Sequence, residues 1–179
     1  MKHSLNIIGK SKKIAGILII LFLIILDQAT KYLAVAHLKD SPAFELIPNV
    51  FELYYLENQG AAFSILWGQK TFFVIITGIL FLIMFYLYLR LPEKNRYVWV
   101  KLVLVLLMAG AVGNLIDRCA HNYVIDFFYF KLINFAVFNV ADIYVTLAAI
   151  SLAVLLIFVY KESDLEFLTF RTKKFRDLK

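Results

Sequence analysis

The sequence predicts an all-α polytopic membrane protein with four transmembrane helices, both termini in the cytoplasm and a small extracytoplasmic β-sheet. Three observations predict this class: the apolar composition, four long apolar segments and the placement of the basic residues. Of the 179 residues, 62% are apolar and 18% are charged, and the mean hydropathy is +0.78. Soluble domains average about 45–50% apolar and about 25% charged residues. The composition therefore excludes a disordered chain, a collagen-like repeat and an ordinary soluble enzyme.

Four segments are long enough to span a membrane, because a spanning helix needs about 20 mostly apolar residues. They are residues 14–36, 72–89, 97–116 and 138–160. The second segment carries no charge, whereas the first carries Asp27 and Lys31 in its later half. We expect a single integral membrane domain over residues 1–179. The segments show no repeat, which argues against an inverted-repeat transporter.

The first segment has an alternative interpretation as a cleaved signal peptide. Lysines precede its apolar run, and the small residues 34–36 resemble a cleavage site. However, the apolar run ends at Leu26, and Asp27 and Lys31 lie between it and the small residues. That gap is too long and too charged for an ordinary cleavage region, so we favour a retained helix.

The basic residues set the predicted orientation. Fourteen of the 19 Lys and Arg residues lie in the N-terminal segment, around the link between the second and third spans, or in the C-terminal tail. Basic residues mark the cytoplasmic side, so both termini are expected there and the connections 37–71 and 117–137 outside. The tail, residues 161–179, is expected to lie on the anionic inner leaflet or simply to fix the topology. In this setting, a net charge of +6 does not imply a nucleic acid partner.

The outer segment at about residues 40–68 differs from the spans. Residues 44–46 and 50–56 are rich in strand formers, with turn signals at residues 48–49 and 58–60. Backbone with unpaired polar groups cannot lie in lipid. We therefore expect a small sheet at the membrane interface, above the hydrocarbon or against the helices.

The acids of the spans gather at the outer end of the predicted bundle. Asp27 lies toward the outer end of the first span, Asp117 follows the third, and Asp142 lies near the start of the fourth. Asp126 lies in the connection between the third and fourth spans. A carboxylate at membrane depth costs about 2.5–3.5 kcal/mol on insertion scales, so it indicates function by default.

Two pairs also have structural explanations. Asp27 and Lys31 are four residues apart and can form an ion pair on one helix face. Asn139 with Asp142 fits a helix N-cap with an acid at position N3, which suits the positive end of the helix dipole. The spacing alone does not decide between these roles and a functional one.

The third span raises the same question. Asp117 could form an ion pair with Arg118 where this span ends. Asp126 has apolar residues on both sides, and a lone acid there needs a partner or a proton. The small residues 109–113 would let a neighbouring helix approach closely, which brings Asn114 and Arg118 near the other acids.

Two adjacent carboxylates can hydrolyse a peptide bond without further groups. They share a proton, because both cannot ionise cheaply. One then takes a proton from water while the other protonates the scissile carbonyl oxygen. The sequence has no G-x-S-x-G, no H-E-x-x-H and only one cysteine, Cys119, so we expect no metal and no cofactor. A proton-coupled carrier or a non-catalytic assembly factor would also place acids in a bundle, and both remain alternatives.

Five motifs, in order along the chain, resemble those of the lipoprotein signal peptidases (signal peptidase II). They are D-Q-x-T-K from Asp27, N-x-G-A-A-F from Asn58, G-x-x-G-N-x-x-D-R from Gly110, V-x-D-F from Val124 and F-N-x-A-D from Phe138. Each motif is weak alone. Five in order over residues 14–160, with no departure at the motif positions, are specific.

The resemblance implies an aspartic endopeptidase of the bacterial cytoplasmic membrane, with its active site on the extracytoplasmic side. The catalytic pair would be Asp126 and Asp142. Other motif residues would position the substrate, orient the pair or support the architecture around it: Asn58, Gly60, Asn114, Arg118, Asn139, Asp117, Asp27 and Lys31.

The resemblance also implies the substrate and the inhibitor. Members of this family cleave prolipoproteins just before a cysteine that bears a diacylglyceryl group, and globomycin-type peptides inhibit them by occupying the site. The expected partners are therefore these precursors and membrane lipids, and a monomer would suffice. We also expect the segment 43–66, with its turn at residues 58–62, to close over bound substrate, since Gly60 gives that turn freedom.

Overall fold

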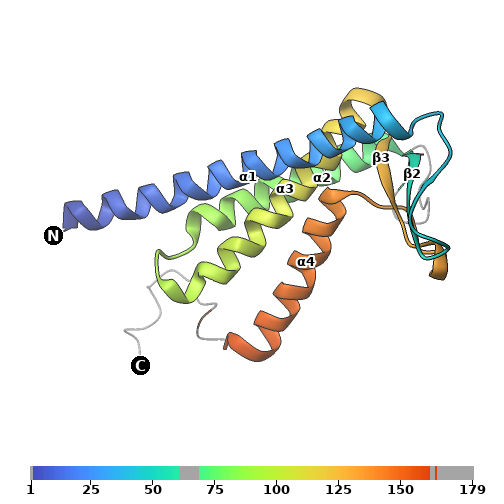
Figure 1. Ribbon diagram of the computed structural model, residues 1–179. Helices are drawn as coiled ribbons and strands as arrows, with labels where there is room; N and C mark the ends of the chain where they lie inside the picture. Colours follow the sequence, from blue (N-terminus) through green and yellow to red (C-terminus); the bar gives the residue numbers. More distant parts are fainter. Residues whose placement is uncertain (1, 61–68, 162–163, 165–179) are drawn as a thin grey trace.

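Four helices form a bundle, and three strands form a sheet at one end of it (Figure 1). The computed structural model describes residues 2–60, 69–161 and 164. The helices are α1 (Lys2–Leu38), α2 (Lys70–Arg90), α3 (Val98–His121) and α4 (Val140–Val154). The strands are β1 (Phe44–Ile47), β2 (Phe51–Asn58) and β3 (Val124–Tyr129). Short helical turns are η2 (Asn95–Tyr97), η3 (Lys131–Ile133) and the π-helical η4 (Leu155–Val159).

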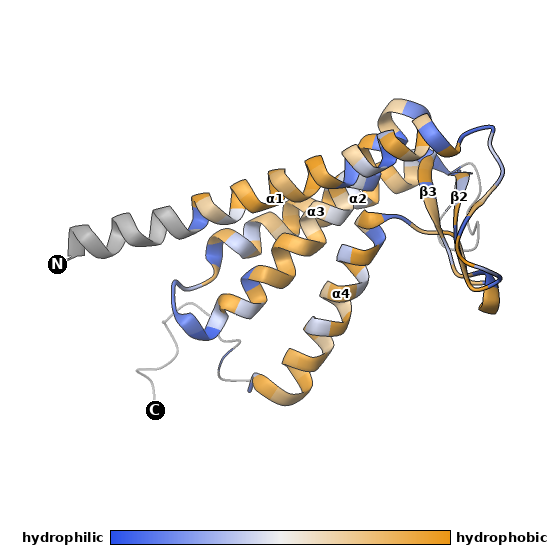
Figure 2. Ribbon diagram, in the orientation of Figure 1, coloured by the Kyte–Doolittle hydropathy of each residue, from blue (hydrophilic) through white to orange (hydrophobic). Residues whose placement is uncertain are grey.

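Four helical stretches of the described chain are long and apolar enough to cross a membrane. They are Lys13–Leu38, Lys70–Arg90, Asn95–His121 and Val140–Val159. Figure 2 shows hydrophobic residues along most of their length. Large apolar side chains such as Phe22, Leu82 and Phe158 point outward, with 64%, 66% and 78% of their surface exposed. This is the arrangement expected when lipid is the solvent, and the prediction of four membrane helices with a small sheet is confirmed.

Helix α3 runs further than the predicted third span. It continues to His121 and ends where Asn122 adopts a left-handed conformation, with φ of 72°. The backbone N–H of Asn122 donates to the Arg118 carbonyl, and asparagine tolerates this conformation better than most residues. Asp117 and Arg118 therefore lie in the last turns of α3 and not beyond it.

The sheet has one strand that is not among the predicted elements. Its order is β1-β2-β3 with antiparallel neighbours, and β3 comes from the connection between the third and fourth spans. The run from Val124 to Tyr129 has the β-branched and aromatic residues of a strand, which was the available signal. Pairing of Leu56 with Asp126 and of Asn58 with Val124 brings the turn after β2 against β3.

Glycines let α1 and α4 approach α3 closely. A Cβ at Gly110 would lie 2.6 Å from the carbonyl oxygen of Ala141, and one at Gly113 would lie 2.5 Å from Oδ2 of Asp27. This confirms the predicted role of the small residues in α3. The close approach places the polar groups of three helices within hydrogen-bond reach at the sheet end of the bundle.

Candidate active site

Asp126 and Asp142 line the same pocket, which has a volume of about 420 Å³. Asp126 is the third residue of β3, and Asp142 is the third residue of α4. The polar part of the wall also includes Asn58, Asn114 and Arg118. The fold thus brings together residues from four separate elements, β2, α3, β3 and α4.

Asn139 contacts both aspartates. Its Nδ2 donates to Oδ1 of Asp126 at 2.6 Å, and its Oδ1 accepts from the backbone N–H of Asp142 at 3.0 Å. The side chain of Asn139 is fully buried, so these partners fix its orientation. The side-chain amide of Asn139 therefore connects the Asp126 carboxyl group to the backbone of Asp142.

Asn58 and Asn114 complete the contacts of the pair. Nδ2 of Asn58 donates to Oδ2 of Asp126 at 2.8 Å, and Nδ2 of Asn114 donates to Oδ1 of Asp142 at 2.8 Å. Oδ2 of Asp142 accepts from the backbone N–H of Asn139 at 3.1 Å. The predicted N-cap is thus a complete capping box, and it also sets the direction of the Asp142 carboxylate.

Asp126 has an unusual protonation equilibrium. Its burial raises its pKa, and the nearby negative charge of Asp142 raises it further, to about 7. The amide donors Asn58 and Asn139 oppose this shift without cancelling it. A carboxyl group with this pKa is partly protonated at neutral pH, as a general acid requires.

Behind the pair lies a buried ion cluster around Lys31. Its ammonium group contacts Oδ2 of Asp27 at 3.0 Å, Oδ2 of Asp117 at 2.8 Å and Oδ1 of Asn114 at 2.9 Å. The two acids and the lysine are each at most 1% exposed. An ammonium group has three donors, so all of them are used. The predicted pairing of Asp27 with Lys31 is present, and Asp117 joins it in place of a pair with Arg118.

The ion cluster also holds the backbone next to each member of the pair. Oδ1 of Asp27 accepts from the N–H of Ala141 at 2.8 Å, and Oδ2 of Asp117 accepts from the N–H of Ile125 at 3.1 Å. Ala141 precedes Asp142, and Ile125 precedes Asp126. Charges in α1 and α3 therefore fix the backbone that carries the pair.

Gln28 is a part of this cluster that the predicted site residues do not include. Its Nε2 lies 3.2 Å from Oδ2 of Asp27, 3.0 Å from Oδ1 of Asp117 and 3.1 Å from the carbonyl oxygen of Gly113. The amide thus joins α1 to α3 beside the ion pairs. Its place within D-Q-x-T-K was the available signal.

Arg118 lines the pocket and contacts Gly60, which follows β2. Nη2 of Arg118 donates to the Gly60 carbonyl at 3.1 Å, and its guanidinium lies 4.7 Å from the ring centre of Phe73. The N–H of Gly60 donates to Oδ1 of Asn58 at 2.9 Å, a turn typical of asparagine. The rest of the N-x-G-A-A-F motif, residues 61–63, lies outside the described residues, so the closing of this turn stays a prediction.

The remaining pocket wall is apolar and continues along α4. Val145 and Leu147 of α4 line the pocket, and 37% and 51% of their surfaces are exposed. In the part of the chain that the structure describes, no group of three or more His, Cys, Asp and Glu residues could hold a metal ion. The arrangement is a carboxyl pair at the polar end of a pocket that reaches the lipid-facing surface.

Known proteins resemble this chain over most of its length. A family model described as signal peptidase (SPase) II matches residues 19–158. A lipoprotein signal peptidase of Caldanaerobacter subterraneus subsp. tengcongensis is 42% identical over 143 residues, which is 80% of this chain and 96% of the relative. One of Streptococcus pyogenes serotype M1 is 40% identical over 153 residues, 86% of this chain and 97% of the relative.

Two solved structures share the fold. Both are described as a bacterial membrane enzyme, determined by the in meso method at 1.9 Å and 2.3 Å. The first has a TM-score of 0.70 and 35% identity, covering 82% of this chain and 94% of that one. The second has a TM-score of 0.69 and 35% identity, covering 79% and 87%.

Proposed function

Because the chain belongs to the signal peptidase II family, whose members are membrane proteases that process prolipoproteins, we propose that it is an aspartic endopeptidase with Asp126 and Asp142 as its catalytic pair. One observation carries the assignment: both carboxyl groups line one pocket, and Asn139 donates to both of them, to Asp126 from its side chain and to Asp142 from its backbone N–H. Family membership favours a protease over the proton-coupled carrier and the assembly factor that the acids alone left open.

The proposed reaction uses the different surroundings of the two acids. Asp126, with its raised pKa, holds the proton and gives it to the scissile carbonyl oxygen. Asp142, whose carboxylate accepts from Asn114 and from the backbone N–H of Asn139, acts as the base that takes a proton from water. The water oxygen attacks the carbonyl carbon. The tetrahedral intermediate then collapses: Asp142 gives its proton to the leaving nitrogen, the C–N bond breaks, and Asp126 takes a proton back from one of the two hydroxyl groups.

The proposed substrate is a prolipoprotein cut just before its diacylglyceryl-modified cysteine. The apolar wall along α4 suits groups that stay in lipid, namely the signal helix and the acyl chains. Asn58, Asn114 and Arg118 are available at the polar end to position the peptide backbone. Globomycin-type peptides would inhibit by occupying this same pocket.

We propose that the site faces the outside of the bacterial cytoplasmic membrane. The basic residues at both ends of the chain and between the second and third helices favour a cytoplasmic location for these parts. The sheet lies at the end of the bundle opposite to the start of α1 (Figure 1), and the pair belongs to β3 of this sheet and to the first turn of α4. In the proposed orientation, the pair faces the side on which an exported precursor emerges. A monomer contains all the proposed site residues.

The experiment is cleavage of a diacylglyceryl-modified precursor by the purified protein and by Asp126→Asn and Asp142→Asn. Each variant loses the proton transfer of one acid, so we expect turnover to fall by at least about 10²–10⁴-fold. Asp40→Asn, an exposed acid of the same outer region, should keep full activity. A thermal unfolding midpoint close to that of the intact protein would show that the variants fold. Near-normal turnover by either pair variant would refute the assignment.

A further inference from the structure

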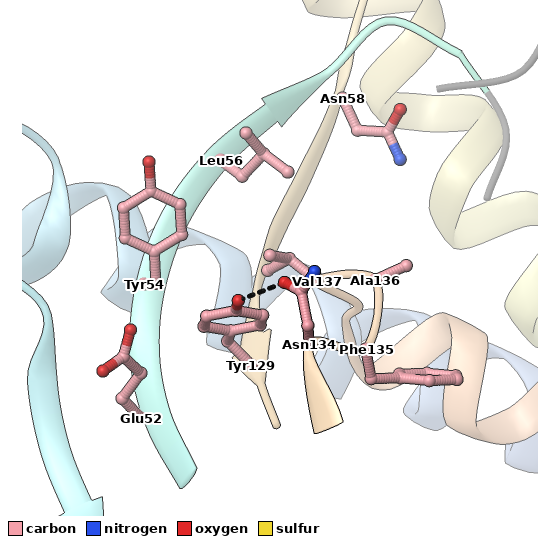
Figure 3. A pocket seen from close by; sticks show the side chains of 9 residues that line it. All are labelled: Glu52, Tyr54, Leu56, Asn58, Tyr129, Asn134, Phe135, Ala136 and Val137. Carbon is pink, nitrogen blue, oxygen red and sulfur yellow. Dashed lines mark hydrogen bonds between the residues drawn. The ribbon is translucent and has the colours of Figure 1, made fainter. Parts of the chain in front are cut away.

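A second pocket, of about 480 Å³, lies on the sheet beside the candidate active site (Figure 3). The two pockets share Asn58 and residues 135–137 in their walls. The pockets are therefore adjacent, and Asn58, which lines both, donates to Asp126. The second pocket thus lies within reach of a peptide bound across the carboxyl pair.

The second pocket follows one face of β2. Glu52, Tyr54, Leu56 and Asn58 alternate along the strand and all line it, as Figure 3 shows. The seven residues from Glu52 to Asn58 span roughly 20 Å, at about 3.3 Å for each of the six steps between them. The pocket thus has the length and direction of an extended peptide that leads away from Asp126.

The walls of the two pockets differ in chemistry. The second pocket presents tyrosine rings at Tyr54 and Tyr129, whose centres lie 6.3 Å apart. Tyr129 donates its hydroxyl proton to Oδ1 of Asn134 at 2.7 Å, which fixes that wall. Glu52, at the far end, is held by Lys131 at 3.0 Å. The second pocket is therefore more polar than the active-site pocket, whose wall along α4 is largely apolar.

We propose that this second pocket binds the first residues of the mature lipoprotein, those that follow the lipidated cysteine. The proposal rests on the proposed function. Cleavage divides the precursor into an apolar signal helix and a polar mature chain, while the acyl groups stay in lipid. The second pocket follows the sheet away from the helices and is the more polar of the two, so it fits the polar half.

The charged residues near Glu52, at the end of the second pocket away from Asn58, favour some peptide residues over others. Lys131 lies between Glu52 and Glu45, at 3.0 Å and 3.2 Å, so the three groups together carry one formal negative charge. These neighbouring acids raise the pKa of Lys131 above its ordinary value, which keeps it charged. The subsite should therefore accept neutral or basic residues better than acidic ones.

The test compares two precursors that are identical up to the modified cysteine. One ends there as an amide, and the other continues for about six residues, the length of the pocket. For the intact protein we expect the extension to lower KM by about 5–10-fold, the size of effect that one buried aromatic contact gives. Tyr54→Ala should lower this ratio toward one, and Tyr54→Phe should restore it. Phe44→Ala, an exposed aromatic of β1 outside both pockets, should keep the ratio.

A labelling experiment covers the case in which Tyr54→Ala does not fold. A photoreactive residue placed third after the cysteine, in a precursor bound to the Asp126→Asn variant, should crosslink to residues 52–56 or 134–137. Crosslinks to α4 instead, or equal KM values for both precursors with the intact protein, would overturn the subsite. If the intact protein cleaves neither precursor, the proposed function itself fails.

Discussion

At the scale of single residues, amides organise the candidate site. Asn139 is fully buried and joins the two acids, while Asn58 and Asn114 each hold one carboxylate oxygen from another element. An amide donates and accepts at once, so it can orient a carboxyl group without adding a charge. The consequence is that Asp126 stays in a buried, weakly compensated place, where its pKa rises to about 7.

This pKa gives a prediction about stability and pH. The folded protein holds a proton on Asp126 up to about pH 7, whereas an unfolded chain releases it near 3.8. Folding therefore binds a proton in this window, and the contribution of Asp126 to stability is lost as the pH rises from about 4 through 7. Asp126→Asn should remove that part of the pH dependence.

The measurement is thermal unfolding in detergent at pH 5 and pH 7. The intact protein should lose more stability between these values than Asp126→Asn does. Asp40→Asn is the control, because Asp40 is exposed. An equal loss for all three proteins would mean that Asp126 is ionised throughout this range.

At the scale of elements, α3 positions the other helices. Its glycines remove the side chains that would separate α3 from α1 and α4, and its polar residues then meet Lys31 and Asp142. Helix association in lipid depends on such close packing, because apolar surface gains nothing by leaving apolar solvent. Small residues in α3 thus have a direct effect on the geometry of the carboxyl pair.

Gly113→Ala tests this dependence. The added Cβ would lie 2.5 Å from Oδ2 of Asp27, so it must displace the buried ion cluster. We expect a loss of about 1–3 kcal/mol in the free energy of unfolding, together with lower turnover. Gly78→Ala in α2 is the matched control: nothing lies within 4 Å of its new Cβ, and loss of a helical glycine should leave stability equal or slightly higher. Equal effects of the two changes would contradict the packing role.

At the scale of the whole molecule, one ion cluster connects α1, α3, β3 and α4. Lys31 neutralises part of the charge of Asp27 and Asp117, and the oxygens of these acids hold the backbone of Ile125 and Ala141. The pair is thereby fixed to the bundle on one side and to the sheet on the other. Removing the lysine would leave two buried carboxylates without a counterion.

Lys31→Met should therefore destabilise the entire fold. Breaking a buried pair by removing one partner costs about 3–5 kcal/mol, because the remaining charge is uncompensated. Lys39→Met is the control: Lys39 pairs with Glu57 at 3.1 Å on the surface, and its loss should change little. The midpoint of thermal unfolding in detergent measures both. A Lys31 variant as stable as the Lys39 variant would show that the buried cluster is not needed for folding.

The sequence by itself determined the features that depend on local order. Twenty apolar residues in a row predict a membrane helix, i to i+4 spacing predicts the contact of Asp27 with Lys31, and the spacing of Asn139 and Asp142 predicts the capping box. The five motifs likewise identified the family, since their residues and order can be read directly from the chain.

Only the tertiary structure decided the contacts between distant segments. These contacts include the pairing of β3 with β2 and the ion pair of Asp117 with Lys31 in place of Arg118. They also include the hydrogen bonds of Gln28 to the buried acids and the second pocket beside Asn58. The physical reason is that these contacts depend on strand register, helix approach and burial. Each of these is fixed by packing between segments dozens of residues apart, and no spacing along the chain encodes it.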